Sequence, residues 1–230
     1  MKTNNYPLVS IIINCFNGQG FIEKAIQSVL DQTYNNFELI IWDNQSTDGS
    51  AKSVMSFQDR RIIYYYSDTH TKLYEARNKA VEKSNGEFIC FLDCDDWWHK
   101  TKIDKQIKKF QEGNFAVVYS NQRIIFQKKT RFGKNFDEII CKLLSRNHIY
   151  NTKIRREGRI LSEILGDYKV GIATAMIKRK FFNGFDNRYH VIGDFEFIIR
   201  IAAKEPIGYV DQILAFYRVH GNNESFIHRK

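Results

Sequence analysis

The first part of the chain alternates short apolar runs with stretches whose apolar residues recur at helical spacing. Buried strands are predicted where β-branched and aromatic residues run together, at residues 9–14, 37–42, 62–66, 88–92 and 116–119. Amphipathic helices are predicted between them, over residues 21–30, 73–83 and 101–112, with a short helix beginning near residue 50. This alternation is typical of a mostly parallel central sheet with helices packed on both faces.

The second part of the chain has a less regular pattern. Strands are predicted at residues 123–127, 172–178 and 213–219, and helices at residues 136–144 and 193–203. The 230 residues include two prolines, Pro7 and Pro206, and contain no low-complexity linker or internal repeat. The pattern therefore predicts a single α/β domain, residues 1–230, with an irregular C-terminal half.

Composition and charge narrow the class of protein. Hydrophobic residues make up 43% of the chain and charged residues 27%, which is typical of globular proteins. The net charge of +9 favours an anionic partner: a nucleotide, a nucleic acid, a phospholipid or a phosphorylated substrate. Basic residues cluster at 128–131, 153–159 and 178–180. Each cluster alone is best explained as a solvated surface, but together they suggest a face that meets anionic lipid headgroups.

The cysteines and the N-terminal residues bear on localisation. The four cysteines form no CxxC pair, and Cys90 and Cys94, if they lie along one strand, are about 13 Å apart and too distant to bridge. Reduced thiols are therefore expected. The first residues lack the apolar core of a signal peptide, and no apolar run approaches the roughly 18 residues of a spanning helix. We expect a cytoplasmic protein that does not span the membrane.

Polar side chains follow three of the predicted strands. Asn14 ends the first, Asp43 and Asn44 follow the second, and Asp93, Asp95 and Asp96 follow the fourth. In sheets of this kind, ligands bind beyond the carboxyl ends of the strands. Carboxylates are the ligands that Mg²⁺ and Mn²⁺ prefer, and phosphate-bound metals are typically held by one or two of them. Although Asp95 or Asp96 alone could cap a turn, three acids together favour a metal site.

A second acidic group, Asp194 and Glu196, begins the helix predicted at 193–203. From the residues alone, Asp194 is best explained as a helix N-cap, and the two side chains point in different directions. The chain has no GxxxxGK[ST] loop, no strand-linked GxGxxG, no HExxH and no GxSxG. These absences argue against phosphate-loop, dinucleotide-binding, zinc-protease and α/β-hydrolase chemistry.

Seen together and in this order, the motifs resemble those of family 2 glycosyltransferases, inverting enzymes with the Rossmann-like GT-A fold. The matching segments are residues 9–17, 37–48, 76–78 and 86–96, followed by 184–186, 192–196 and 217–225. The resemblance implies a nucleotide-sugar-binding half, about residues 1–121, and an acceptor-binding half with the catalytic base, about residues 122–230. Each motif alone is weak, and none identifies a substrate.

The resemblance also implies donor-binding roles. Asn14 and Phe16 would line the base pocket, with Phe16 stacked on the nucleobase. Asp43 and Asn44 would hold the base and ribose. Arg77 would meet the donor phosphates, although a cation on the helix surface is an equal alternative. Where many relatives have a second aspartate, this chain has Asn44, which weakens the indication of uridine but leaves a UDP-sugar as the preferred donor.

Catalytic and metal-binding roles follow from the same resemblance. Asp93, Asp95 and Asp96 match the DxD-type motif: Asp93 would contact the donor, Asp95 the ribose or the metal, and Asp96 the metal and diphosphate. Asp194 matches the catalytic base. His220 lies in a segment that helps to bind metal or diphosphate in some relatives, but a packing role is equally open. A divalent cofactor, Mn²⁺ or Mg²⁺, is implied.

The implied acceptor is a glycan or a lipid-linked glycan, reached at the inner face of the plasma membrane. Three alternatives remain open. A nucleotidyltransferase acting on sugar phosphates would also use metal-binding aspartates, but would be expected to have a glycine- and arginine-rich loop after the first strand. A nucleic-acid-binding module is suggested by the net charge but by no recognised sequence motif, so no nucleic-acid partner is expected. A non-catalytic nucleotide-sugar-binding protein is disfavoured by the intact acidic motifs.

Overall fold

The computed structural model describes residues 6–126, 156–168, 170–220 and 223. Its centre is an eight-stranded sheet of order β3-β2-β1-β4-β7-β6-β8-β5. The parallel part of the sheet consists of β3 (Ile62–Tyr66), β2 (Phe37–Asp43), β1 (Val9–Cys15) and β4 (Phe88–Asp93). The remaining strands are β7 (Met176–Lys178), β6 (Val117–Phe126), β8 (Ile207–Val219) and β5 (Trp97–Trp98). Of these, β7 runs antiparallel to both neighbours and β5 antiparallel to β8, while β6 and β8 are parallel.

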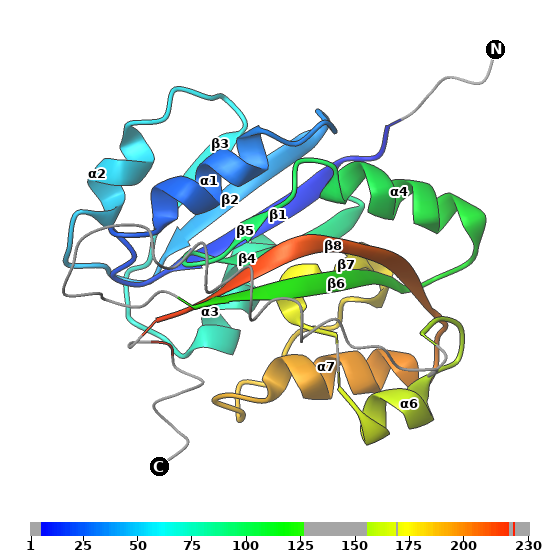
Figure 1. Cartoon of the computed structure of the whole chain (residues 1–230). Helices are drawn as coiled ribbons and strands as arrows, with labels where there is room; N and C mark the ends of the chain where they lie inside the picture. The colour runs from blue at the N-terminus through cyan, green and yellow to red at the C-terminus, as the bar shows by residue number, and fades with distance from the viewer. Residues whose placement is uncertain (1–5, 127–155, 169, 221–222, 224–230) are drawn as a thin grey trace.

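Helices cover both faces of the sheet (Figure 1). One face packs against α1 (Ile22–Leu30), α2 (Ser50–Met55) and α4 (Lys102–Glu112). The other packs against α3 (Leu73–Glu82), α6 (Leu161–Gly166) and α7 (Gly193–Ala202). Two short 3₁₀ turns, η1 (Ile172–Thr174) and η2 (Arg179–Phe181), flank β7.

Strand β1 explains why both faces need helices. All seven of its residues are buried. Ile11 and Ile13 belong to the core on the α1 side, whereas Ile12 belongs to the core on the α3 side. Because successive side chains of a strand point to opposite faces, a continuous apolar run requires cover on both sides.

The predicted fold class is confirmed, with differences in the C-terminal half. Residues 123–126 continue β6 and do not form a separate strand. Residues 172–174 form a 3₁₀ turn, which leaves β7 with three residues. The sequence pattern missed β5 and α6, because a two-residue strand and a six-residue helix are too short to show a period. The helix predicted at 136–144 lies outside the described residues.

A buried polar network joins the amino ends of β1, β2 and β4. Oε1 of Glu38 accepts hydrogen bonds from the Ser10 hydroxyl at 2.7 Å and from the backbone N–H of Gly86 at 3.2 Å. The guanidinium of Arg179 donates to the hydroxyl of Ser84 at 2.7 Å and to the backbone carbonyl of Gly86. This network holds the strands at the end of the sheet opposite the predicted site.

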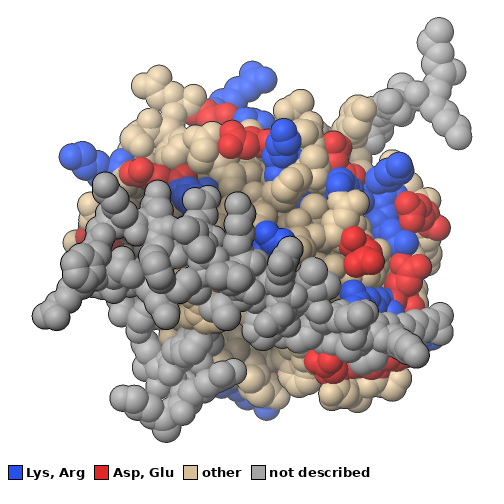
Figure 2. All heavy atoms as spheres, viewed as in Figure 1, with Lys and Arg blue, Asp and Glu red and all other residues tan. Residues whose placement is uncertain are grey.

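The network changes the interpretation of one basic cluster. Arg179, at the centre of residues 178–180, has a structural role and is not a free surface charge. The cluster at 128–131 lies outside the described residues, as does most of 153–159. On the face shown in Figure 2, the Lys and Arg side chains outside the grey area lie among Asp and Glu side chains. In the described part of the chain, no helix is long and apolar enough to cross a membrane.

Candidate functional site

The sheet brings polar residues from three strands to one edge. In the register of the parallel strands, Asn14 lies opposite both Trp42 and Asp93, and Cys15 lies opposite Asp43. The carboxyl ends of β1, β2 and β4 therefore meet where the sequence predicted a ligand site. The buried runs that precede these residues fix the strand ends, because the apolar pattern stops there.

The turn after β4 is braced by the end of β8. Arg218 donates from its backbone N–H to Oδ1 of Asp96 at 2.8 Å, and from Nε to the carbonyl of Asp95 at 2.7 Å. Nε2 of His220 lies 3.0 Å from Oδ2 of Asp95, and Nδ2 of Asn223 donates to the same oxygen at 3.2 Å. The C-terminal strand thus holds the acidic turn in place.

The electrostatics of this turn suit a divalent cation. Burial raises the pKa of Asp95, and the neighbouring Asp93 raises it further. Burial raises the pKa of Asp96 well above its usual range, with added effects of Asp93 and Asp95. Three carboxylates therefore share a partly buried turn. Arg77 pairs with Asp93 and the positive charge of Arg218 opposes the rise at Asp96, but burial has the larger effect. Carboxylate oxygens are the ligands that Mg²⁺ and Mn²⁺ prefer.

The described residues do not form a ready-made metal cage, however. Among them, no group of three or more His, Cys, Asp or Glu side chains is arranged to hold a metal ion. Asp95 and Asp96 fit the case in which one or two carboxylates bind a cation and phosphate oxygens complete its coordination. The observed partner of His220 is the carboxylate of Asp95. A role of His220 as a metal ligand stays a prediction.

Asp43 and Asn44, which were predicted to hold the base and ribose, make hydrogen bonds within the loops after β2 and β3 and to β3 itself. Asp43 accepts hydrogen bonds from the backbone N–H of Ser46 at 2.7 Å and from the hydroxyl of Tyr64 at 2.8 Å. The amide of Asn44 donates to the carbonyl of Thr71 at 2.7 Å and accepts from its N–H at 3.1 Å. Both side chains therefore have structural partners, and their contacts with a base and ribose stay predictions.

Phe16 and Asn14 are more open to a ligand. The Phe16 residue is 52% exposed, and its ring lies 4.5 Å from the ring of His70, which leaves an aromatic surface at the mouth of the site. Asn14 is 9% exposed, and neither its Nδ2 nor its Oδ1 has a hydrogen-bond partner among the described residues. An unpaired buried amide is costly, so a ligand or water that bonded to Asn14 would relieve the cost.

Asp194 lies close to this edge, on the α3 side of the sheet. It is the second residue of α7, whose N-cap is Ile192, so the prediction that Asp194 is the N-cap was wrong. Its Oδ1 accepts from the backbone N–H of Phe195 at 2.9 Å and lies 3.4 Å from the hydroxyl of Tyr74. Glu196 instead pairs with Arg200 at 2.8 Å, which confirms that the two acids point in different directions.

Arg77 was predicted to meet the donor phosphates or to be a cation on the helix surface. The residue is 2% exposed, so it is not a cation of the helix surface. Its Nη2 donates to Oδ1 of Asp93 at 2.5 Å. Burial raises the pKa of Asp194, and the positive charge of Arg77 opposes that rise. The observed partner of Arg77 is thus a carboxylate of the acidic turn, and contact with donor phosphates stays a prediction.

Several neighbours of the site were not predicted. Tyr74, Arg218 and Asn223 all contact predicted residues; Arg218 and Asn223 lie in the 217–225 motif, which was the available signal. The structure also brings Cys15 and Cys94 together. A hydrogen bond from the Cys94 thiol, more than any other effect, lowers the pKa of Cys15 to about 7.

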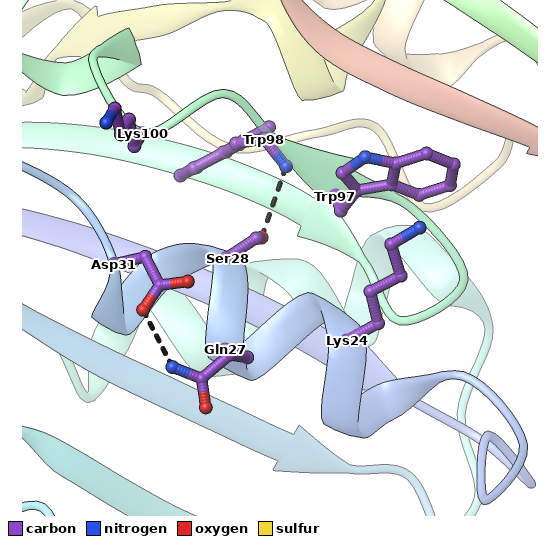
Figure 3. Close-up of a pocket in the computed structure, with 7 residues that line it drawn as sticks. All are labelled: Lys24, Gln27, Ser28, Asp31, Trp97, Trp98 and Lys100. Atoms are coloured by element: carbon purple, nitrogen blue, oxygen red, sulfur yellow. Dashed lines mark hydrogen bonds between the residues drawn. The ribbon is translucent and has the colours of Figure 1, made fainter.

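A cavity of about 210 Å³ lies between α1 and β5 (Figure 3). Of the carboxylates predicted for the site, none lines it. The amine of Lys24 points at the ring of Trp97, 3.3 Å from its centre, and the backbone N–H of Trp98 donates to the hydroxyl of Ser28 at 3.1 Å. The two tryptophans thus pack beside the acidic turn.

Comparisons with known proteins identify relatives of this chain. The profile of the family described as "Glycosyl transferase family 2" matches residues 10–185. The chain is 37% identical over 134 residues to the "Putative teichuronic acid biosynthesis glycosyltransferase TuaG" of Bacillus subtilis, which is 57% of this chain and 53% of that protein. It is 32% identical over 179 residues to the "UDP-Glc:alpha-D-GlcNAc-diphosphoundecaprenol beta-1,3-glucosyltransferase WfgD" of Escherichia coli, which is 77% of this chain and 63% of that protein.

Solved structures share the fold at low sequence identity. The structure of S. aureus TarS 1–349 in complex with UDP-GlcNAc superposes with a TM-score of 0.73 at 16% identity, over 94% of this chain and 59% of that chain. The mannosyltransferase PcManGT from Pyrobaculum calidifontis, in complex with GDP-Man and Mn²⁺, superposes with a TM-score of 0.67 at 14% identity, over 96% of this chain and 59% of that chain. The chain thus spans less than two thirds of the length of these relatives.

Proposed function

The chain belongs to glycosyl transferase family 2, and we propose that it moves a sugar from a nucleotide-diphosphate donor to a hydroxyl group of a glycan or lipid-linked acceptor, with inversion at the anomeric carbon. One observation carries the proposal. The acidic turn from Asp93 to Asp96 and the buried carboxylate of Asp194 lie at one edge of the sheet, and Arg77 lies between them. Such an edge can hold a charged leaving group next to a proton acceptor.

A UDP-sugar is the proposed donor. The names of relatives support this choice, since WfgD uses UDP-Glc and TarS was solved with UDP-GlcNAc. The exposed ring of Phe16 would stack on the base. PcManGT, which shares the fold, binds GDP-Man, so the fold alone does not select uridine over guanosine.

A divalent cation, Mn²⁺ or Mg²⁺, is the proposed cofactor. Asp95 and Asp96 would hold it, and His220 is a third candidate ligand. When bound, the cation would neutralise negative charge on the departing diphosphate. The Mn²⁺ in the PcManGT complex supports a cation in this fold, and the clustered carboxylates of the acidic turn support it in this chain.

In the proposed reaction, Asp194 is the general base. Its carboxylate takes the proton from the acceptor hydroxyl as that oxygen forms a bond to the anomeric carbon of the sugar. The bond between that carbon and the diphosphate oxygen breaks in the same step, and a nucleoside diphosphate leaves. Because there is a single displacement, the configuration at the anomeric carbon inverts.

A lipid-linked glycan is the proposed acceptor class. The name of WfgD, whose acceptor carries diphosphoundecaprenol, supports it. An enzyme with such an acceptor would work at the membrane surface, and we propose peripheral contact at its cytoplasmic face. The net charge of +9 is compatible with anionic headgroups.

The substitution Asp194→Asn tests the proposal. It should lower turnover roughly 10²- to 10⁴-fold, because an amide cannot accept the proton, while donor binding persists. Glu196→Gln is the matched control, since Glu196 lies on the same helical turn but pairs with Arg200. Transfer and nucleoside diphosphate release would be measured with UDP-sugars, Mn²⁺ and a lipid-linked acceptor. Near-normal transfer by Asp194→Asn would exclude it as the base, and release of pyrophosphate would indicate a nucleotidyltransferase.

A further inference from the structure

Arg77 is a buried cation in an aromatic setting. The rings of Tyr74, Phe91 and Phe185 lie 5.7, 5.8 and 5.8 Å from its guanidinium carbon. A buried charge is costly unless it is paired, and the ion pair of Arg77 joins it to Asp93, whose side chain is 36% exposed and open to the site. Arg77 therefore links the interior of the α3 layer to the acidic turn.

The same helix reaches Asp194. Tyr74 and Arg77 are three positions apart in α3 and so lie on one helical face. The hydroxyl of Tyr74 donates to the carbonyl of Val191 at 2.9 Å, which fixes the start of α7 next to α3. The charges of Asp93 and Asp194 both favour the charged form of Arg77, although burial opposes it; together they raise the pKa of Arg77.

We propose that Arg77 is a positioning residue that keeps the Asp194 carboxylate ionised for proton transfer while it holds Asp93 at the sheet edge. The inference rests on the proposed function, in which Asp194 is the base. A general base must be unprotonated when the acceptor arrives, and Asp194 is buried, which favours its neutral form. Arg77 supplies the opposing positive charge.

The groups that face Asp194 come from four parts of the fold. Tyr74 and Arg77 come from α3, Asp93 from β4, and Tyr168 from the segment after α6; the backbone N–H of Phe195 comes from α7 itself. Asp93 favours the neutral carboxyl of Asp194, whereas Arg77 and the Phe195 N–H favour the carboxylate. Loss of Arg77 therefore removes the main effect that opposes burial.

The test is the pH dependence of turnover in Arg77→Gln at saturating donor and acceptor. Without the cation the pKa of Asp194 rises, so the acid limb of the profile should move up by about one to three pH units. Activity lost near neutral pH should return at alkaline pH. Arg77→Lys keeps the charge and should keep the limb near that of the parent. Arg200→Gln, the matched control, removes an arginine that pairs with Glu196 and should leave the limb unmoved.

A second readout does not depend on transfer. Carbon-13 NMR of the aspartate carboxyl groups, with the Asp194 signal assigned from its loss in Asp194→Asn, should show Asp194 titrating at higher pH in Arg77→Gln. Asp93→Asn alters a more exposed residue and removes a charge that favours neutral Asp194, so it should move the titration to lower pH. Adding Arg77→Gln to Asp93→Asn removes both charges of the ion pair and leaves neither buried alone, and should move the titration back to higher pH; this comparison isolates Arg77 where Arg77→Gln alone does not fold. Unmoved titrations in the variants, or an equal loss of turnover at every pH, would overturn the proposal. If the titrations move as expected but Asp194→Asn transfers normally, the proposed function fails and the electrostatic coupling stands.

Discussion

Lys102 lies in the core on the α1 and α4 side of the sheet with none of its surface exposed. Its amine donates to Oε1 of Gln106 at 2.7 Å and lies 4.0 Å from the centre of the Trp98 ring. Burial lowers the pKa of Lys102 to about 8. No step of the proposed reaction uses this lysine, so its effect should appear in stability.

The direction in which stability changes with pH depends on whether the folded or the unfolded chain binds the proton of Lys102. Between about pH 8 and the usual lysine value of 10.5, the unfolded chain binds a proton that the folded chain does not, so stability rises with pH across this window. Below pH 8 the full cost of the buried charge is present, on the order of 3 kcal/mol. Lys102→Met should therefore flatten the pH dependence of the free energy of unfolding between pH 8 and 10.5.

Denaturant unfolding at several pH values measures this slope. Lys108→Met is the matched control, because Lys108 is exposed on the same helix. The parent and the control should share the rise with pH that Lys102→Met lacks. If the free energy of unfolding changed with pH in the same way in all three proteins, Lys102 would be charged in the folded state up to its usual pKa, and the prediction would be wrong.

At the scale of elements, β1 and β4 approach closely at their amino ends. A methyl group at Gly86 would lie 2.4 Å from the backbone nitrogen of Ser10 and 2.9 Å from the carbonyl oxygen of Leu8. Both of these are backbone atoms, which cannot move aside without shifting β1. The strand pairing that places Asn14 beside Asp93 begins at this contact.

Gly86→Ala should therefore destabilise the protein by about 1–3 kcal/mol or more. Gly20→Ala is the control, since a methyl group there meets nothing within 4 Å, and its effect should stay within about 0.5 kcal/mol. Urea unfolding of the two variants compares them directly. Equal stability would mean that the strands can separate at Gly86 at little cost.

At the scale of the whole molecule, the site joins both halves of the chain. The acidic turn after β4 is held by Arg218 of β8 and by His220 just after that strand, more than 100 positions later. A ligand that binds this turn in the folded state alone stabilises the whole domain by mass action, by about 2.7 kcal/mol at one hundred times its dissociation constant.

UDP with Mn²⁺ should therefore raise the unfolding temperature, and UDP with a chelator should raise it less, since the cation joins the diphosphate to the carboxylates. Asp96→Asn should lose the part that depends on Mn²⁺. Calorimetric unfolding with UDP, Mn²⁺ and both together separates the contributions. Equal stabilisation with and without Mn²⁺ in the parent would contradict the metal assignment.

Much of the sheet, and the sheet edge at which the candidate site residues meet, followed from the sequence. The apolar runs that form β1, β2 and β4 end at Asn14, Asp43 and Asp93, and parallel strands bring such ends to one edge. The motifs also predicted membership of glycosyltransferase family 2, which the match over residues 10–185 confirms. These properties depend on local periodicity and on the order of segments, both of which one sequence contains.

Tertiary structure alone decided how the charges pair. Arg77 was predicted to meet phosphates or solvent; it is buried and pairs with Asp93, and contact with phosphates stays a prediction. From the residues alone Asp194 was explained as a helix cap; it lies inside α7 near Tyr74, 120 positions away, and its role as the base stays a prediction. Periodicity shows which face of a helix is buried, but not which residue of another element it meets. That choice depends on strand register and helix packing, which follow from contacts between distant segments.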